Sequence, residues 1–197
     1  MKSNQLNAKD LITLAIFSVV FIVVYMVCAL PTGLLVPLYP FCVGIAMIPC
    51  GIVWVYLRVK VPKPLAILIQ GALFAILAFV MGSGWFVAAG ILIGAVGAEL
   101  FARLGGYRNF TWNVVGYAVF ALCLNLGIFA IILLARDYYY NFCIESGMTA
   151  EYMTELLAFV SGPLLVLTCA LSVVGAVIGM LLGRVFLKKH FIKAGIV

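Results

Sequence analysis

The sequence predicts an all-α, polytopic membrane protein with six transmembrane helices, and its composition and length lead to this fold class. Of the 197 residues, 67% are apolar and only 9% are charged. A water-soluble domain has about 45–50% apolar and about 25% charged residues, so this chain lacks the polar side chains to cover a surface in water. A helix crosses the bilayer core with about 20 mostly apolar residues, which leaves room for about six crossings. We therefore expect a single transmembrane domain over residues 1–197.

The first three predicted helices each begin or bend at a residue with a known structural preference. The first covers about 10–30, with Asp10 as a suitable N-cap, and we interpret it as a retained helix and not as a cleavable signal peptide. The second covers about 41–57, and Pro49 inside it predicts a kink. The third covers about 64–81 and starts on a proline, which suits a first helical turn.

The remaining three predicted helices cover about 85–104, 112–135 and 159–187. The last is longer than a single crossing requires, so we expect it to tilt or to emerge into water. A long, net acidic connection over residues 136–157 separates it from the helix before.

The basic residues predict the orientation of the bundle. An even number of crossings places both termini on one side of the membrane. That side receives Lys2, Lys9, Arg58, Lys60, Lys63, Arg103, Arg108, Arg184, Lys188, Lys189 and Lys193. The other side receives only Arg136. Cytoplasmic loops are enriched in Lys and Arg, so we expect cytoplasmic N- and C-termini and do not interpret the net charge of +6 as a sign of nucleic-acid binding.

The stretch "ARDYYYNF", residues 135–142, follows the fifth apolar run and lies at its outer end in this topology. Tyrosines commonly occupy the membrane interface, so an interfacial belt with a solvated Arg–Asp pair is one interpretation. Three consecutive helical residues point about 100° apart, however, so at least one tyrosine should face the bundle or the loop. Aromatic rings with a few convergent polar groups suit a small-molecule pocket. The candidate substrate-binding residues are Tyr39, Trp85, Asn125, Arg136, Asp137, Tyr138, Tyr139 and Tyr140.

Glycines recur every four residues in two of the predicted helices. They are Gly90 and Gly94 in the fourth, and Gly175, Gly179 and Gly183 in the sixth. Such spacing lets helix backbones approach closely, either inside the bundle or against a partner membrane protein.

A carboxylate and six cysteines are the remaining polar or reactive groups within the apolar runs. Glu99 precedes Arg103 by four residues, which favours a structural ion pair over a proton or ion role. The cysteines lack metal-like spacing, and Cys42 with Cys143 is the only plausible disulfide. The sequence has no nucleotide-binding loop, no HExxH and no nucleophile elbow, and a single histidine, His190. We therefore predict no enzymatic activity, no metal and no cofactor.

Four segments resemble a known family. They are "AKDLITLAIFSVVFIVVY", "MGSGWFVAAGILIGAVGAELFARLGGYRNF", "ARDYYY" and "GMLLGRVFLKKHFIKAGIV". The chain is similar over nearly its whole length to the MptD-type (Trep_Strep) family, substrate-binding S components of energy-coupling factor (ECF) transporters. This resemblance implies a six-helix protein of the bacterial cytoplasmic membrane that binds a small organic micronutrient outside the cell. It also implies a transmembrane coupling subunit (EcfT-like) and two cytoplasmic ATPase subunits as partners, besides membrane lipid and the small-molecule substrate.

The first helix departs from the pattern of this family. Many S components carry an Ala-xxx-Ala stripe there to meet the coupling subunit, whereas Ala15 is followed four residues later by a valine. Our candidates for this docking face are Ala8, Ala15 and Ser18. Two other functions stay open at this point: a self-contained oligomeric facilitator or channel for a small solute, and a non-transport membrane protein, either an enzyme or an assembly factor.

Overall fold

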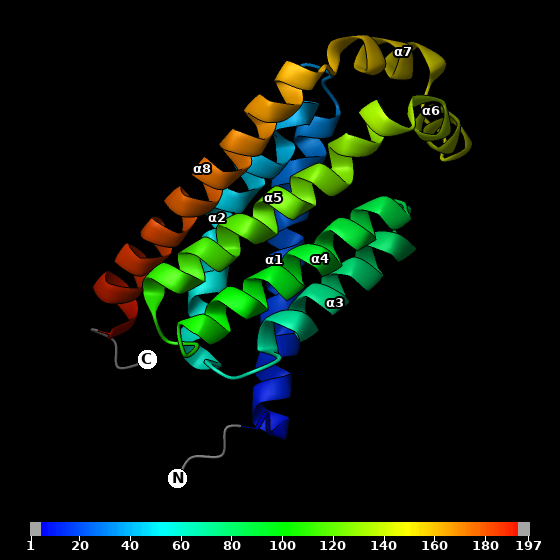
Figure 1. Ribbon diagram of the computed structural model, residues 1–197. Helices are drawn as coiled ribbons and strands as arrows, with labels where there is room; N and C mark the ends of the chain where they lie inside the picture. Colours follow the sequence, from blue (N-terminus) through cyan, green and yellow to red (C-terminus); the bar gives the residue numbers. More distant parts are fainter. Residues whose placement is uncertain (1–4, 193–197) are drawn as a thin grey trace.

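The protein is a helical bundle, which confirms the predicted fold class (Figure 1). A computed structural model describes residues 5–192, and no strand occurs among them. The helices are α1 (Ala8–Gly33), α2 (Cys42–Lys60), α3 (Ala66–Val80), α4 (Trp85–Leu104), α5 (Phe110–Leu134), α6 (Arg136–Glu145), α7 (Ala150–Phe159) and α8 (Gly162–Phe186). A short 3-10 turn, η1 (Tyr39–Phe41), precedes α2, and a π-helical segment, η2 (Leu187–Ile192), continues α8.

Five of these helices, namely α1, α2 with η1, α4, α5 and α8, are long and apolar enough to cross a membrane, and α3 is a shorter apolar helix of 15 residues. α3 begins at Ala66 and not at the expected residue 64, because Leu65 has a left-handed backbone with φ 67°. α2 continues through Pro49 without interruption.

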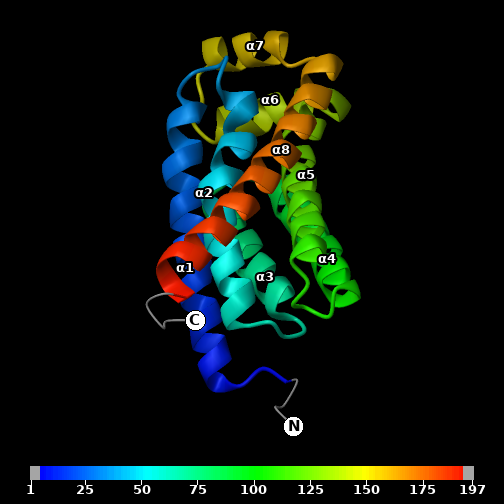
Figure 2. The same ribbon diagram turned by 90° about the vertical axis from the view of Figure 1, so that its left-hand side faces the viewer.

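The long helices run side by side, and the start of α1 and the end of α8 lie at the same end of the bundle (Figures 1 and 2). We call this the basic end, because Arg58, Lys60, Arg103 and Lys188 belong to elements that end there, and Lys63 lies in the loop between α2 and α3. α4 packs mainly on α3 and α5, whereas α2 packs mainly on α1 and α8. The opposite end carries α6 and α7, and we call it the capped end (Figure 1).

The segment over residues 136–157 differs from the open connection that the sequence suggested. It folds into α6 and α7, which are joined through Gly147 with φ 94°. α7 begins at the N-cap Thr149, whose side chain accepts a hydrogen bond from the backbone N–H of Tyr152. The expected start of the last helix at Phe159 is wrong, because Phe159 ends α7 and α8 begins at Gly162.

The start of α1 also corrects an expectation. The N-cap is Asn7, and Asp10 is the third helical residue of a capping box in which each side chain accepts the backbone N–H of the other residue at 2.9 Å. The carboxylate of Asp10 additionally pairs with Lys63 at 2.6 Å. Asp10 therefore connects α1 to the loop between α2 and α3.

We expect Asp10→Ala to lower the free energy of unfolding by about 1–2 kcal/mol, because it removes a cap and a partly buried ion pair together. Thermal unfolding in detergent micelles measures this change. Lys9→Ala is the matched control, since Lys9 is the exposed neighbour of Asp10 and its side chain has no part in the cap. Equal midpoints for the two variants would contradict this role of Asp10.

All five glycines of the two stripes lie in contacts between helices. Gly90 and Gly94 face α5, where a Cβ on Gly90 would lie 2.7 Å from the carbonyl oxygen of Cys123. Gly175, Gly179 and Gly183 face α2, and Gly175 meets the carbonyl oxygen of Gly44. The stripes therefore serve packing within the chain, and they are not available as free surfaces.

Glu99 binds the start of α3, which differs from the expected pair with Arg103. Its two carboxylate oxygens accept the backbone N–H groups of Leu65 at 2.7 Å and Ile67 at 3.2 Å. α3 has no side-chain cap of its own. The carboxylate of α4 thus supplies the missing cap and fixes α3 against α4 at the basic end.

Candidate functional site

A cavity of about 460 Å³ lies between the long helices and the two short helices of the capped end. Its lining comes from α1, η1, α2, α3, α4, α5, α6, α7 and the loops beside them. Pockets for small molecules commonly have volumes of about 300–1,000 Å³, so this cavity has the size for a small organic ligand. We call it the outer cavity.

Two tyrosines from distant parts of the chain meet at its wall. The hydroxyl oxygens of Tyr39 in η1 and Tyr139 in α6 are 3.4 Å apart. The ring of Tyr39 packs edge-on against Phe129 of α5, and the ring of Tyr139 packs edge-on against Phe86 of α4. The two hydroxyls are thus held by packing on both sides and can together contact one polar group of a ligand.

The short helices close the cavity at the capped end. Its lining here includes Phe142 and Cys143 of α6, Met148 of the following loop and Tyr152 of α7. The hydroxyl of Tyr152 donates to the carbonyl oxygen of Gly33 at 2.8 Å, which joins α7 to the end of α1. Burial raises the pKa of Tyr152, Tyr139 and Cys143. These three side chains therefore stay protonated at neutral pH and act as neutral hydrogen-bonding groups.

The floor of the outer cavity is aromatic. Tyr25 of α1 and Phe74 of α3 line it, and their rings pack edge-on with centroids 5.2 Å apart. Phe74 also packs on Phe21, which contacts Trp54 and Phe120 in the core of the bundle. A rigid aromatic core therefore supports this end of the pocket.

No charged side chain lines the outer cavity among the described residues. An ion inside it would lose its hydration without gaining an opposite charge, which disfavours charged ligands. Aromatic faces and hydroxyl or thiol groups remain as the available contacts. The cavity therefore suits an uncharged, partly apolar molecule.

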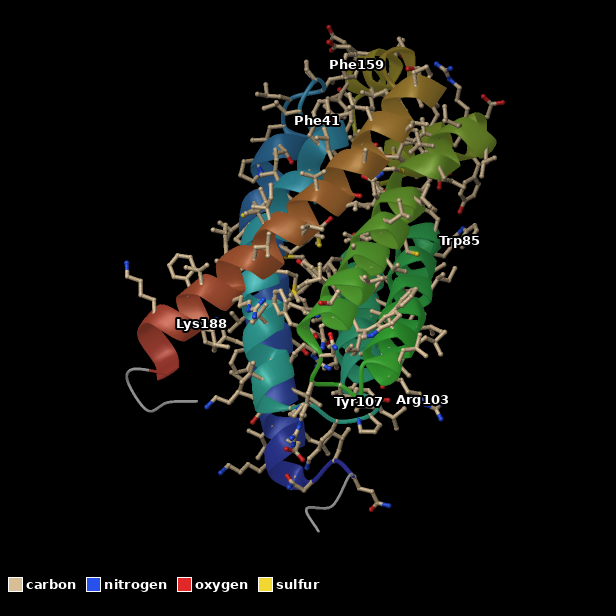
Figure 3. The ribbon with its side chains drawn as sticks, turned by 60° about the vertical axis from the view of Figure 1, so that its left-hand side comes forward. Phe41, Trp85, Arg103, Tyr107, Phe159 and Lys188 are labelled. Atoms are coloured by element: carbon tan, nitrogen blue, oxygen red, sulfur yellow. The ribbon has the colours of Figure 1, made fainter. Side chains whose placement is uncertain are left out.

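Of the candidate residues predicted from the sequence, Tyr39 and Tyr139 line the outer cavity. Trp85 and Tyr138 lie outside it: the indole N–H of Trp85 donates to the hydroxyl of Tyr138 at 2.9 Å, and both side chains are exposed. Figure 3 shows Trp85 on the outside of the bundle. This pair fixes α6 against the start of α4.

Four further candidate residues also lie outside the lining of the outer cavity. Arg136 and Asp137 are exposed at the start of α6, and Tyr140 is half-buried. Asn125 is fully buried, and its side-chain amide donates to Thr168 at 3.2 Å and to the sulfur of Cys169 at 3.4 Å. Asn125 therefore joins α5 to α8, and a direct ligand contact by these four stays a prediction.

Most of the lining was missed from the sequence. Tyr25, Phe74, Phe86 and Phe142 lie in four different helices, and no local pattern distinguishes them from other buried aromatics. Tyr152 had a detectable signal, because a threonine cap precedes buried apolar residues at the spacing of one helical face in α7. Recognising α7 would have placed Tyr152 beside the end of α1.

Cys42 and Cys143 both line the outer cavity, but all six cysteines are free thiols in this structure. The docking residues predicted on α1 are divided: Ala8 and Ala15 are exposed, whereas Ser18 is 1% exposed. Ser18 is buried inside the bundle, so the prediction that it belongs to an exposed docking face is wrong.

Comparison with known proteins identifies the family of this chain. A search of the curated proteins and a search of the solved structures each found no match. The family model described as "Hypothetical bacterial integral membrane protein (Trep_Strep)" matches residues 8–193. This match covers nearly the whole chain and agrees with the segments that carried the resemblance. The protein therefore belongs to the Trep_Strep family of bacterial integral membrane proteins.

Proposed function

We propose that this protein is the substrate-capture S component of an ECF-type ABC importer for a small organic micronutrient. The observation that carries this proposal is the outer cavity, which eight helical elements and the loops beside them build at the end of the bundle opposite the basic end. Membership of a family of integral membrane proteins supports a transport role. The chain has no nucleotide-binding loop, so energy for uptake would come from separate ATPase subunits.

The orientation in this proposal follows from the distribution of charge. The basic end faces the cytoplasm under the positive-inside rule, and the capped end then faces the outside of the bacterial cell membrane. The N- and C-termini are cytoplasmic in this arrangement. The outer cavity would bind solute from outside, and α6 and α7 would form its outer wall.

The lining suggests the class of solute. Four tyrosines line the cavity, namely Tyr25, Tyr39, Tyr139 and Tyr152, beside several phenylalanines. Stacked or edge-on aromatic contacts favour a planar ring, and the neutral hydroxyls favour carbonyl, amide or hydroxyl groups on it. We therefore propose an uncharged, ring-containing solute.

In this proposal, α1 is the helix that docks on the coupling subunit. Its outward face carries a row of large apolar residues, and only a minority of the helix is buried. The exposed members of this row include Leu11, Ile12, Ile16, Val19 and Val23. Together with Ala8 and Ala15 they form a broad apolar surface on which a transmembrane coupling subunit could dock.

Mass spectrometry of small molecules retained by the purified, full-length protein tests the binding site. We expect one retained species at a stoichiometric amount in the natural sequence. The double variant Tyr39→Phe with Tyr139→Phe keeps both rings but removes two hydroxyls, so we expect retention to fall about tenfold, the loss of two neutral hydrogen bonds of about 0.5–1.5 kcal/mol each. Tyr140→Phe is the matched control, because Tyr140 is a neighbour of Tyr139 in α6 but does not line the cavity.

Equal retention in the double variant and the control would remove the outer cavity as the binding site. The absence of any retained species in the natural protein at all purification conditions would count against an S component. Retention should also be unchanged between about pH 5 and pH 8, because burial raises the pKa of Tyr139, Tyr152 and Cys143 away from this range.

Reconstitution separates this function from a self-contained facilitator. The retained molecule, once identified and isotopically labelled, should enter proteoliposomes only when coupling and ATPase subunits and ATP are present. Entry through this chain alone would favour the facilitator. The burial of both glycine stripes inside the bundle argues against the oligomeric form of that alternative, because the stripes were its expected contact surface.

A further inference from the structure

A second cavity, of about 400 Å³, lies at the basic end and is separate from the outer cavity. It is formed by the end of α2, the loop between α4 and α5, the start of α5 and the end of α8. In Figure 3, α8 and the start of α5 diverge towards this end, which carries the labelled Tyr107 and Lys188. We call it the inner cavity.

The inner cavity contains a buried cation without a hydrogen-bond partner. Arg58 lines it and is only 5% exposed, yet none of its three guanidinium nitrogens has a hydrogen-bond partner in the structure. The guanidinium lies 5.8 Å from the ring of Trp54, which gives a weak cation–π contact. A buried charge without a partner is costly, since it has lost its hydration, so a group that binds Arg58 would stabilise this arrangement.

The nearest candidate partner within the chain is already occupied. Glu99 interacts electrostatically with Arg58, but both oxygens of its carboxylate accept backbone N–H groups at the start of α3. No ion pair joins Glu99 to Arg58 among the described residues. The three donor nitrogens of Arg58 therefore stay without a hydrogen-bond partner, in a residue that lines the inner cavity.

Three more basic side chains line the same cavity, and no acidic side chain does among the described residues. They are Arg108, Arg184 and Lys188. Arg184 lies over the ring of Phe110, with 4.6 Å between the guanidinium carbon and the ring centroid. Four cations that line one cavity favour an anion with several acceptor oxygens, and arginine pairs especially well with phosphate.

Two further features narrow the class of ligand. The oxygen of the Asn113 side chain has no partner, and its amide nitrogen donates to the carbonyl of Asn109 at 2.8 Å, which fixes the direction of the group. This free acceptor suits a hydroxyl beside the anionic group. Val55, Val59 and Met180 supply apolar walls next to the cations. The ligand that fits has a phosphate with an apolar or hydroxylated substituent.

We propose that the inner cavity is a binding site for a phosphate group with net negative charge, with Arg58 as its central donor. Basic pockets between transmembrane helices commonly bind phospholipid headgroups, and the inner cavity lies at the basic end of the bundle. The same chemistry would recognise a soluble phosphate, so the source is decided by experiment. This proposal does not depend on solute capture in the outer cavity.

Thermal unfolding of the full-length protein, delipidated in detergent, tests the site. One pair of samples receives phosphatidylglycerol or phosphatidylcholine in the same detergent, which compares anionic with zwitterionic lipid. A second pair receives sodium phosphate or sodium chloride at equal ionic strength. A ligand that binds only the folded state raises the unfolding midpoint. We expect phosphatidylglycerol, inorganic phosphate or both to raise the midpoint more than their controls.

Three variants assign the effect to the inner cavity. Arg58→Met replaces a buried cation by an apolar side chain, which is often neutral or stabilising without a ligand. Arg184→Gln removes an exposed member of the lining and should fold normally. We expect both to weaken the apparent affinity about tenfold or more, since each loses charge-assisted hydrogen bonds. Arg103→Gln is the matched control, because Arg103 is a basic residue of the same end that does not line the cavity.

A response to phosphatidylglycerol alone assigns the site to a lipid headgroup, and a response to inorganic phosphate assigns it to soluble phosphate. Midpoints that do not rise above their controls would overturn the proposal. Equal responses in Arg184→Gln and Arg103→Gln would also overturn it, whether or not Arg58→Met folds.

Discussion

Gly179→Ala is expected to destabilise the protein by about 3 kcal/mol, because one added methyl group would force two packed backbones apart. Gly179 of α8 faces α2, and a Cβ built on it would lie 2.5 Å from the carbonyl oxygen of Ile48 and 2.6 Å from that of Met47. The contact is mutual, since a Cβ on Gly51 would lie 2.5 Å from the carbonyl carbon of Gly179. The neighbours are backbone atoms, which cannot turn away as the end of a side chain can.

Gly162→Ala is the matched control for this prediction. Gly162 starts the same helix, and nothing lies within 4 Å of a Cβ at that position. Alanine is about 1 kcal/mol better than glycine inside a helix, so the control should be neutral or slightly stabilised. Far-ultraviolet circular dichroism during heating in detergent measures both midpoints. A Gly179→Ala midpoint equal to that of Gly162→Ala would show that α2 and α8 are not in close contact.

The helices of the bundle could be predicted because their signal is local. Each apolar run is long enough to cross a bilayer, or nearly so in α3, and this requirement can be read without knowledge of neighbours. Element boundaries were less accurate. Asn7 and not Asp10 caps α1, and the short helices α6 and α7 lay hidden in a segment that seemed to be a loop. Each of these helices has only 10 residues, so its amphipathic pattern is too short to distinguish it from a polar loop.

The outer cavity could be predicted only in part, because it is assembled from helices far apart in the sequence. A cluster of polar and aromatic residues at 136–140 suggested one local wall, but consecutive helical residues point in different directions. Of the three tyrosines there, only Tyr139 lines the cavity. Tyr138 instead binds Trp85 on the outside. Position in the chain thus indicated the correct end of the bundle but not the correct faces.

The role of Glu99 illustrates the same difficulty for a single residue. Spacing to Arg103 favoured an ion pair within α4, which is a contact between neighbours on one helix. The structure instead brings the start of α3 to the carboxylate, where the N–H groups of Leu65 and Ile67 have no partner within their own helix. Backbone donors without a partner in their own helix bind a nearby carboxylate more strongly than an exposed arginine side chain does.

We expect Glu99→Ala to lower the free energy of unfolding by about 3 kcal/mol, because it removes two charge-assisted hydrogen bonds from N–H groups, one buried and one partly buried. Glu99→Gln keeps one acceptor oxygen and should lose about half as much. Glu155→Ala is the matched control, since Glu155 is an exposed carboxylate of α7. Thermal unfolding measures the three variants, and hydrogen exchange at Leu65 and Ile67 should accelerate in Glu99→Ala alone among the alanine variants.

Glu99→Ala can also be measured in an Arg58→Met background. This comparison separates the contribution of the Glu99 cap on α3 from the contribution of its charge near Arg58. In Glu99→Ala, the buried guanidinium of Arg58 loses its nearest negative charge as well. If that charge contributes, Glu99→Ala should be less destabilising in an Arg58→Met background, with a coupling free energy of about 1 kcal/mol. The faster hydrogen exchange at the start of α3 should persist in the double variant, because Arg58→Met restores no acceptor for the N–H groups of Leu65 or Ile67. Normal exchange protection at those two amides in Glu99→Ala would show that the carboxylate does not cap α3.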